Sequence, residues 1–152
     1  MSPEELKIQL TALSPSVQFE EGGEWLNAQI DPADWGRVAP LLKSTAGLDM
    51  DYLFCLTCVD WKTHLTMVYH FTSTLHRHTL VVKVKLDRNQ PVTETVSAIW
   101  RTAEFHEREV YELFGVNFLN HPDLRLLILP DGWEGKNPLR KDFEDPVNMI
   151  KL

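Results

Sequence analysis

The sequence lacks the motifs by which proteins bind nucleotides and the segments by which they enter or cross membranes. It contains neither a Gly-x-Gly-x-x-Gly pattern nor a Gly-Lys-Ser/Thr loop, so we expect this chain alone to bind no nicotinamide, flavin or nucleoside triphosphate. No apolar run approaches the ~20 residues that span a bilayer. The polar, acidic N-terminus has neither the basic nor the apolar region of a secretory signal. These absences predict a cytoplasmic protein that reaches a membrane only by docking on a complex there.

Cysteine is scarce, since Cys55 and Cys58 are the only two in the chain. Their Cys-x-x-Cys spacing is typical of metal and redox sites, but the apolar run from Leu53 to Val59 predicts a buried strand. Residues three apart on a strand point to opposite faces, and no further cysteines complete a tetrathiolate site. We interpret both cysteines as structural and expect no metal ion or iron–sulfur cluster in this chain.

Basic residues are too few for non-specific nucleic-acid binding, because the 152-residue chain carries a net charge of −7. The charge is uneven: residues 1–60 hold ten acidic and three basic residues, whereas residues 61–152 hold twelve of each. Interleaved charges of both signs suit a specific protein interface, although ordinary surface variation explains such an asymmetry more simply. An apolar fraction of 43% predicts a folded globular chain.

Apolar periodicity, capping residues and turn residues predict a mixed chain of helices and strands. Ser2 and Pro3 begin a first helix, and Asp31 and Pro32 begin a second. Short connections between three later strands predict an antiparallel meander with one face covered. The expected elements are a helix over 3–13, a hairpin of strands over 17–20 and 25–30, a helix from 32 weakened by Pro40, strands over 52–61, 65–72 and 78–86, and a helical region from Pro91 to a cap at Gly115.

Residues 1–115 are therefore predicted to form an α+β domain, a two-layer sandwich with helices packed on one face of a mostly antiparallel mixed sheet. Residues 116–152 contain too many prolines and glycines for long regular elements. We interpret 116–152 as an extended interface tail of the same single domain, whose ordered shape comes from neighbouring polypeptides. Its cluster Arg140-Lys141-Asp142, interleaved with apolar residues, favours a docking surface over a solvated tail. These apolar residues are Trp133, Leu139 and Phe143.

Glu107 is an unusual charged residue because it falls on the apolar stripe of its predicted helix. A buried carboxylate needs a partner, and we expect Arg125 or Arg140 from the tail to supply it. The alternative is a helix break near Glu104 that turns Glu107 toward solvent. The stripe comprises Ile99, Ala103, Val110 and Phe114, whereas Arg108, Glu109 and Glu112 fall outside it.

His121 and Asp123 stand together in a predicted loop and offer half of an acid–base pair. No serine or cysteine nucleophile in a supporting motif accompanies them, so a hydrolase triad is not expected. Because Asp and Pro are typical turn formers, we prefer a structural interpretation of this loop. A small stand-alone enzyme that uses His121 and Asp123 is the alternative from a different class.

Three blocks in the last third of the chain resemble the pattern of a known family. They are Glu107 to Val116 (EREVYELFGV), His121 to Ile128 (HPDLRLLI) and Asn137 to Phe143 (NPLRKDF). In this order they are similar to the C-type or 30 kDa subunit of respiratory complex I, the bacterial NADH:quinone oxidoreductase. The upstream layout, including Val59-Asp60 at the end of the third strand, is similar more weakly.

The resemblance implies a non-redox peripheral-arm subunit that scaffolds the quinone-site and iron–sulfur subunits while electrons pass from NADH to quinone and protons are translocated. FMN, iron–sulfur clusters, NADH and quinone would all lie on other subunits, and the isolated chain would have no catalytic activity. The implied partners are the large D-type subunit and the B-type subunit, which together form the quinone pocket, and other peripheral-arm subunits, on the cytoplasmic side of the bacterial inner membrane.

The resemblance also implies structural or interface roles, and no catalytic, cofactor-binding or metal-binding role, for the charged residues of the three blocks. These residues are Glu107, Arg108, Glu109, His121, Arg125, Arg140, Lys141 and Asp142. Two further interpretations are open. The chain is the equivalent subunit of a membrane-bound hydrogenase or formate hydrogenlyase-type complex, or it is a stand-alone interaction domain.

Overall fold

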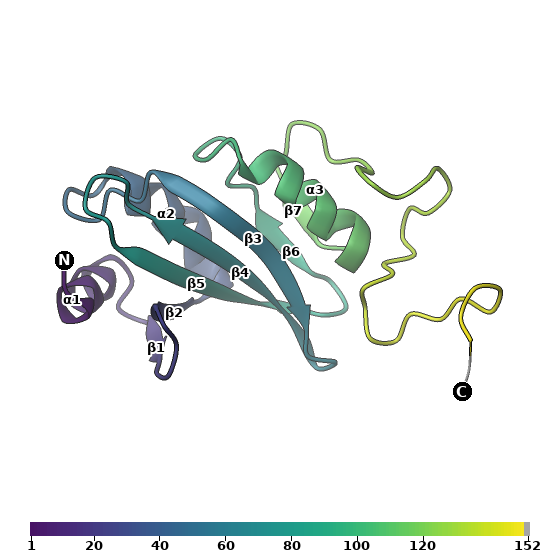
Figure 1. Cartoon of the computed structure of the whole chain (residues 1–152), viewed down its shortest axis with the longest axis horizontal. Coiled ribbons are helices and arrows are strands. Elements are labelled where there is room, and N and C mark those ends of the chain that lie inside the picture. Colours follow the sequence, from purple (N-terminus) through teal and green to yellow (C-terminus); the bar gives the residue numbers. More distant parts are fainter. Residues whose placement is uncertain (151–152) are drawn as a thin grey trace.

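The structure, a computed structural model, describes residues 1–150. Three helices and seven strands occur in that part of the chain, and a long irregular segment follows the last strand (Figure 1). In chain order the elements are α1 (Pro3–Leu13), β1 (Gln18–Glu20), β2 (Leu26–Ile30), α2 (Pro32–Ser44), β3 (Tyr52–Asp60), β4 (His64–Thr72), β5 (Thr79–Asp87), β6 (Val92–Glu94), α3 (Ala103–Phe114) and β7 (Asn117–Leu119).

Five of the strands form one sheet in the order β1-β2-β5-β4-β3. All its pairs are antiparallel except β2 with β5. That parallel pair follows from the connection, because the chain passes through α2 before the β3-β4-β5 meander brings β5 beside β2. The predicted hairpin and the predicted meander are both confirmed.

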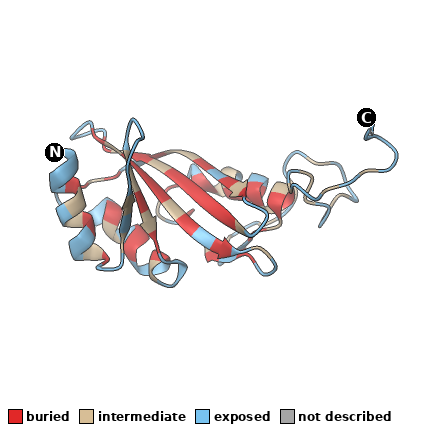
Figure 2. Ribbon diagram, turned by 90° about the horizontal axis from the view of Figure 1, so that it is seen from below, coloured by how far each residue is buried: buried red, intermediate tan, exposed pale blue. Residues whose placement is uncertain are grey.

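The helices cover one face of this sheet. Alternate side chains of β4 and β5, such as Tyr69 and Val82, point into a core that they share with α2 and α3. Trp35 of α2 is fully buried there, and its ring centroid lies 4.7 Å from that of Tyr69. Figure 2 shows buried residues along the strands and the inner helix faces, while the C-terminal segment is mostly exposed. The predicted α+β two-layer fold is confirmed.

The residues that cap the first two helices act as predicted. The Ser2 hydroxyl accepts a hydrogen bond from Glu5 N at 3.3 Å, and the Asp31 carboxylate accepts one from Ala33 N at 2.8 Å. Pro40 does not end α2, which continues to Ser44. Proline removes one hydrogen bond from a helix interior, and the burial of the apolar face of α2 offsets that loss.

The region after Pro91 differs from the prediction. Pro91 precedes the short strand β6 rather than a helix, and its carbonyl accepts a hydrogen bond from the N–H of Asn117, the first residue of β7. The helical spacing of Val96, Ile99 and Trp100 reflects a single turn, closed by hydrogen bonds from Ile99 N and Trp100 N to Val96 O. The regular helix α3 begins only at Ala103.

The first residues of the predicted tail also form a regular element. Strand β7 pairs in parallel with β6, with Thr93 opposite Phe118. Neither strand has more than three residues, which is too short for alternation of apolar and polar residues to reveal it. Within the predicted tail, residues 151–152 lie outside the described residues.

Gly115 ends α3 with a left-handed φ of 78°, which confirms its predicted role as a C-terminal cap. A Cβ atom at this position would lie 2.7 Å from Asn137 Nδ2. Glycine therefore serves two purposes here, since it adopts the left-handed conformation without strain and leaves room for the Asn137 side chain beside the helix end.

Gly115→Ala is expected to lower the free energy of unfolding by roughly 2 kcal/mol, because the left-handed backbone and the close approach of Asn137 both oppose a side chain. Gly132→Ala is the matched control, since Gly132 has φ 87° but nothing within 4 Å of the added Cβ. We expect that control to lose about 1 kcal/mol at most. Urea unfolding followed by tryptophan fluorescence measures both, and equal losses would contradict the role of the close approach.

Candidate functional site

The segment after β7 runs along the C-terminal half of α3 and then away from the sheet (Figure 1). We call residues 121–150 the tail. Hydrogen bonds fasten its main chain to residues 1–120, which we call the body, at two sites that we call the helix anchor and the strand anchor, and at a link between them. Between and beyond these anchors the tail carries exposed apolar side chains. The tail is a long segment with no hydrophobic core of its own, yet specific hydrogen bonds fix its path. For this reason we take it as the candidate functional site.

The helix anchor depends on Glu112, whose side chain is buried on the face of α3 that meets the tail. Its carboxylate accepts hydrogen bonds from Leu127 N at 2.8 Å, Ile128 N at 3.0 Å and Leu129 N at 3.2 Å. A buried carboxylate is tolerated only when its lone pairs are satisfied. Three consecutive amide donors satisfy it and fix the direction of the tail main chain.

Arg108 completes the helix anchor one turn earlier on α3. Its Nε donates to Arg125 O at 3.1 Å, and its Nη2 donates to Leu126 O at 2.6 Å. Residues four apart on a helix lie on the same side. Arg108 therefore satisfies two tail carbonyls while Glu112 satisfies the next three tail amides. The residue pair thus complements both polar groups of the tail backbone.

The strand anchor is built on Asp60, the last residue of β3, which is 3% exposed. Its carboxylate accepts two hydrogen bonds from Arg88, each 2.9 Å long, one from Lys62 N at 2.8 Å and one from Lys141 N at 2.9 Å. Arg88 also pairs with Asp142 at 3.1 Å. The Arg88 guanidinium holds the pKa of Asp60 far below its usual range. Asp60 and Arg88 thus bind the tail at Lys141-Asp142.

Arg140 adds a link between the two anchors. Its Nε donates to Phe114 O at the end of α3 at 2.7 Å, and Leu139 N donates to Leu113 O at 3.1 Å. These bonds use carbonyls that a helix leaves unpaired at its C-terminus. Our expectation that the tail takes its shape from neighbouring polypeptides is therefore wrong for residues 125–129 and 139–142, because hydrogen bonds to the body of the same chain fix them.

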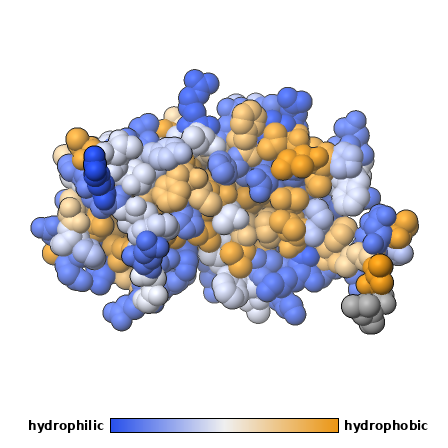
Figure 3. All heavy atoms as spheres, viewed as in Figure 1, coloured by the Kyte–Doolittle hydropathy of each residue, from blue (hydrophilic) through white to orange (hydrophobic). Residues whose placement is uncertain are grey.

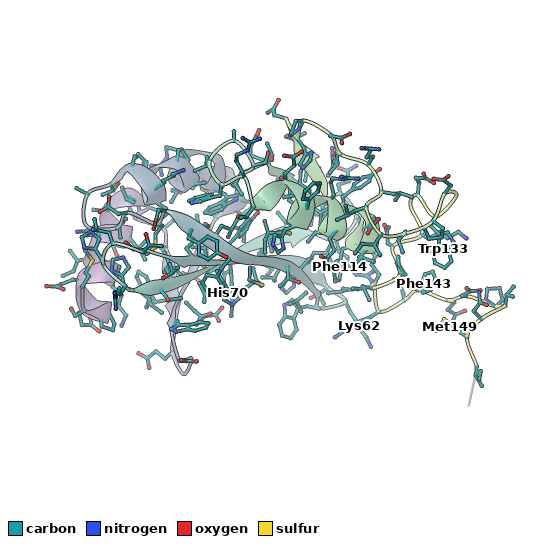
Figure 4. All side chains as sticks on the ribbon, turned by 45° about the horizontal axis from the view of Figure 1, so that its top comes forward. Lys62, His70, Phe114, Trp133, Phe143 and Met149 are labelled. Carbon is teal, nitrogen blue, oxygen red and sulfur yellow. The ribbon has the colours of Figure 1, made fainter. Side chains whose placement is uncertain are left out.

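The anchors use the tail main chain and leave many of its apolar side chains in solvent. Figure 3 shows apolar surface around α3 and along the tail. Trp133 and Phe143 lie side by side in the tail, with ring centroids 6.3 Å apart, and Met149 lies farther along it (Figure 4). We define the tail surface as the exposed apolar residues Leu127, Ile128, Leu139, Val147, Met149 and Ile150.

Glu107 is fully buried, as predicted, but its predicted partner is wrong. The carboxylate accepts hydrogen bonds from Thr95 Oγ1 at 2.5 Å and Val96 N at 2.8 Å. Arg125 instead pairs with Asp123, and Arg140 binds the end of α3. The loop before α3 brings hydroxyl and amide donors to Glu107, and a sequence pattern does not show this because the loop has no regular period.

His121 is held by the main chain on both sides of its ring. Its Nδ1 accepts from Asp123 N at 3.0 Å, so Nε2 carries the proton and donates to Glu104 O at 2.9 Å. This bonding fixes the orientation of the imidazole, whose Nε2 lies 3.7 Å from the Glu107 carboxylate. Asp123 turns its carboxylate to Arg125 rather than to His121. The arrangement agrees with the structural interpretation of this loop and not with an acid–base pair.

The remaining predicted site residues differ in their surroundings. Glu109 is exposed on α3, and Lys141 places its ammonium 6.0 Å from the ring centroid of Trp61. Three residues of the anchors were missed: Asp60, Arg88 and Glu112. Glu112 lies outside the apolar stripe, yet it is buried because α3 is covered on a second side by the tail.

Burial raises the pKa of Glu107 to about 7, and its hydrogen bonds from Thr95 and Val96 only partly oppose this. Between pH 4.5, the ordinary pKa of a glutamate, and pH 7, Glu107 is therefore protonated in the folded protein and ionised in the unfolded chain. The associated stability is complete below 4.5 and is lost as the pH rises to about 7.

Glu107→Gln is expected to remove this pH dependence. The wild type should lose on the order of 3 kcal/mol of stability between pH 5 and pH 8 through this group, and the variant should lose much less. Denaturant unfolding at several pH values measures the difference. Glu104→Gln, a half-buried glutamate earlier in α3, is the control. Parallel stability curves for wild type and Glu107→Gln would show that Glu107 does not titrate in this range.

Cys55 and Cys58 are both free thiols. Cys58 belongs to the core, and burial raises the pKa of its thiol to about 12. A protonated thiol is a poor metal ligand because the thiolate is the binding form. Within residues 1–150, no three or more His, Cys, Asp or Glu side chains are grouped to hold a metal ion. No helix of that part is long and apolar enough to cross a membrane.

The family model of the 30 kDa subunit of the respiratory-chain NADH dehydrogenase matches residues 28–147, which include both anchors. The chain belongs to this family. Residues 28–147 also contain all three blocks on which the resemblance was based.

The curated relatives come from several kinds of complex. The chain is 43% identical over 114 residues to the fused C/D-type subunit of NADH-quinone oxidoreductase of Phocaeicola vulgatus, covering 74% of this chain and 22% of that one. It is 40% identical over 112 residues to the C-type subunit of Chloroherpeton thalassium, covering 72% and 46%. It is 38% identical over 140 residues to the C-type subunit of F(420)H(2) dehydrogenase of Methanosarcina mazei, covering 89% and 87%. The chain thus spans less than half the length of the first two.

Solved structures share the fold. A trypsin-resistant fragment of Nqo5 superimposes with a TM-score of 0.71 at 24% identity, covering 81% of this chain and 100% of the fragment. A chain of the archaeal membrane-bound sulfane sulfur reductase superimposes with a TM-score of 0.76 at 26% identity, covering 93% and 85%. These likenesses support the α+β fold described above.

Proposed function

We propose that this chain is a non-redox peripheral-arm subunit of a proton-translocating NADH:quinone oxidoreductase. The observation that carries the proposal is the anchored tail. Buried charged groups of the body satisfy its main chain, while the apolar side chains of the tail surface remain exposed. Folding of the isolated chain leaves the apolar surface of such a segment in water, whereas binding to a partner buries it. Because burial of apolar surface is favourable, the segment contributes more free energy to binding than to folding.

The anchors lower the entropic cost of that binding. Ordering a flexible segment at an interface costs free energy for every residue that is fixed. Here residues 125–129 and 139–142 already have a defined main chain before any partner arrives. The tail surface then acts as a preformed ridge of apolar side chains flanked by charges, the composition of a protein interface core and its rim.

The proposed partners are the D-type and B-type subunits of the quinone site, with other peripheral-arm subunits nearby, on the cytoplasmic side of the bacterial inner membrane. FMN, iron–sulfur clusters, NADH and quinone belong in this proposal to those other subunits. The chain contributes by position: it holds its neighbours so that the electron-transfer centres and the quinone site keep their geometry. Residues 1–115 and residues 116–152 act in this role as one domain.

The test is purification of the tagged full chain from its host membranes in mild detergent, with the companions identified by mass spectrometry. The proposal expects recovery with a quinone-site subunit, an iron–sulfur subunit and a flavin-binding subunit that oxidises NADH. Recovery of the chain alone from the soluble fraction would overturn it, as would catalytic turnover by the purified chain without companions.

In a second candidate function the chain has the same scaffold role, but in a complex that oxidises an electron donor other than NADH. The relative from Methanosarcina mazei, named as a subunit of F(420)H(2) dehydrogenase, aligns with most of this chain and has nearly its length. An equivalent subunit of a hydrogenase-type complex is a related possibility. The same purified complex distinguishes these functions, because only an NADH-oxidising complex reduces quinone with NADH and contains a flavin-binding NADH subunit.

A further inference from the structure

The sheet face turned away from the helices carries a groove of ≈ 580 Å³. Its lining spans all the strands of the five-stranded sheet, with Val59 of β3, Thr66 and Val68 of β4, and Lys83 and Lys85 of β5 at its centre. The strand register places these residues on one face, because Thr66 lies opposite both Val59 and Lys85, and Val68 lies opposite Lys83.

The floor of the groove is apolar, and its mouth presents an aromatic ring. Val68 and Thr66 are each only 9% exposed although no helix of residues 1–150 covers this face. Trp61 is 56% exposed at one end and stacks on the His64 ring, with centroids 6.5 Å apart. Tryptophan beside a shallow apolar floor is a frequent anchor of protein interfaces.

The lining contains two lysines, Lys83 and Lys85, and one glutamate, Glu20, so the groove has an excess of positive charge in a chain that is negative as a whole. Lys83 pairs with Glu20 at 2.5 Å. No carboxylate within residues 1–150 lies within ion-pairing distance of Lys85, the other central lysine. Burial, together with Lys85, lowers the pKa of His64. The groove therefore offers an unpaired cation beside an apolar floor, which complements a segment that carries a carboxylate next to an apolar side chain.

The groove adjoins the strand anchor. Lys141 N binds Asp60, and the Lys141 ammonium lies 6.0 Å from the ring of Trp61 at the mouth of the groove. A protein bound to the tail surface near Lys141 therefore reaches the groove without crossing other elements. The surfaces of the tail and of the sheet are continuous at this point.

We propose that the groove binds an extended acidic segment of a companion subunit, with a carboxylate against Lys85 and an apolar side chain on the floor formed by Val59 and Val68. This inference rests on the proposed function for the existence of a companion and adds a second contact surface to it. It names the chemistry of the segment, since a basic or purely apolar segment would leave Lys85 unpaired in the interface.

A water-soluble carbodiimide tests the proposal in the assembled complex, because it joins a lysine amine directly to a neighbouring carboxylate. The expected product is a cross-link between Lys85 and an Asp or Glu of another subunit, identified by mass spectrometry. Acetylation of Lys85 should also fall roughly tenfold or more on assembly, since a buried interface excludes reagent. Lys7, a half-buried lysine on α1 that pairs with Glu4 and lies outside the groove lining, is the internal control and should react equally in both states.

Lys85→Gln serves as the matched variant, and Lys62→Gln, in the turn after β3, is its control. The Lys85 variant should lose the intersubunit cross-link and keep its companions through the tail surface. Unchanged acetylation of Lys85 on assembly would overturn the proposal that a companion subunit occupies the groove. Protection of Lys85 from acetylation without a cross-link to a carboxylate would overturn the proposal that the bound segment is acidic. A cross-link to a second copy of this chain would overturn the proposal that the segment belongs to a companion subunit. Failure of the proposed function appears differently, as a chain that purifies with no companions.

Discussion

Glu112→Gln is expected to release residues 127–129 from α3. The Glu112 carboxylate accepts hydrogen bonds from three consecutive amides, whereas a glutamine has one acceptor oxygen and turns an amide donor toward the other donors. Hydrogen bonds to a charged group contribute about 1.5–3 kcal/mol each, and more than one is lost. We expect local opening of the tail to become easier by roughly 2–4 kcal/mol.

Hydrogen exchange measures this release directly. Since each 1.4 kcal/mol is a factor of ten, the amides of Leu127, Ile128 and Leu129 should exchange roughly 30- to 1,000-fold faster in the variant. The β4 and β5 amides should change little, because the core does not depend on the tail. Glu109→Gln is the control, since Glu109 lies on the same helix and is exposed. Equal exchange in the two variants would refute the helix anchor.

Asp60→Asn is expected to lower the free energy of unfolding by roughly 3–5 kcal/mol at pH 7, the usual cost of removing one partner of a buried ion pair. Asparagine leaves Arg88 without a carboxylate partner in the body and removes acceptors from Lys62 N and Lys141 N. The Asp60 pKa is held far below its usual value, so its stabilisation is present above the unfolded pKa of about 3.8 and is lost as the pH falls below it.

Urea unfolding at pH 7 and near pH 3 tests this prediction. The difference between wild type and Asp60→Asn should be largest at pH 7 and should shrink in acid. Asp142→Asn is the control, because Asp142 binds the same guanidinium from an exposed position and exposed pairs contribute about 1 kcal/mol at most. A loss for Asp60→Asn no larger than that of Asp142→Asn would contradict the strand anchor.

The regular elements were predictable because local rules decide them. Ser2 and Asp31 cap helices by accepting hydrogen bonds from residues close to them in sequence. The alternation of apolar and polar residues in β5 shows by itself which side of the strand faces the core. The short strands β6 and β7 were missed because each depends on a partner far along the chain rather than on its own period. Pro91, which looked like the start of a helix, supplies instead a carbonyl to that pairing.

The charged residues show where the sequence stops being sufficient. Periodicity placed Glu107 in the core correctly, but the predicted partner, Arg125 or Arg140, was wrong because Thr95 and Val96 donate to the carboxylate. Glu112 was placed on the outer side of α3, and that placement was wrong because the tail buries it. A contact between two segments of one chain is decided by tertiary packing, and a single helical pattern contains no information about it.

The resemblance contributed what the local rules did not. The blocks around Glu107, His121 and Arg140 marked the region that became the anchored tail, and family membership then followed from the match over residues 28–147. Structural or interface roles were implied for the charged residues of these blocks, and among them two arginines bind this chain's own backbone. Arg108 and Arg140 hold the tail in place, so their effect on a companion would be indirect.

The most direct test of the account is recovery of companion subunits by the tagged chain when the helix anchor is broken. Wild type, Glu112→Gln and Glu109→Gln are expressed to equal levels and purified from membranes in mild detergent, and the companions are quantified by mass spectrometry. The account predicts that wild type and Glu109→Gln recover the same companions and that Glu112→Gln recovers several-fold less, with its sheet still folded. Equal recovery by all three, or no companions with any of them, would contradict it.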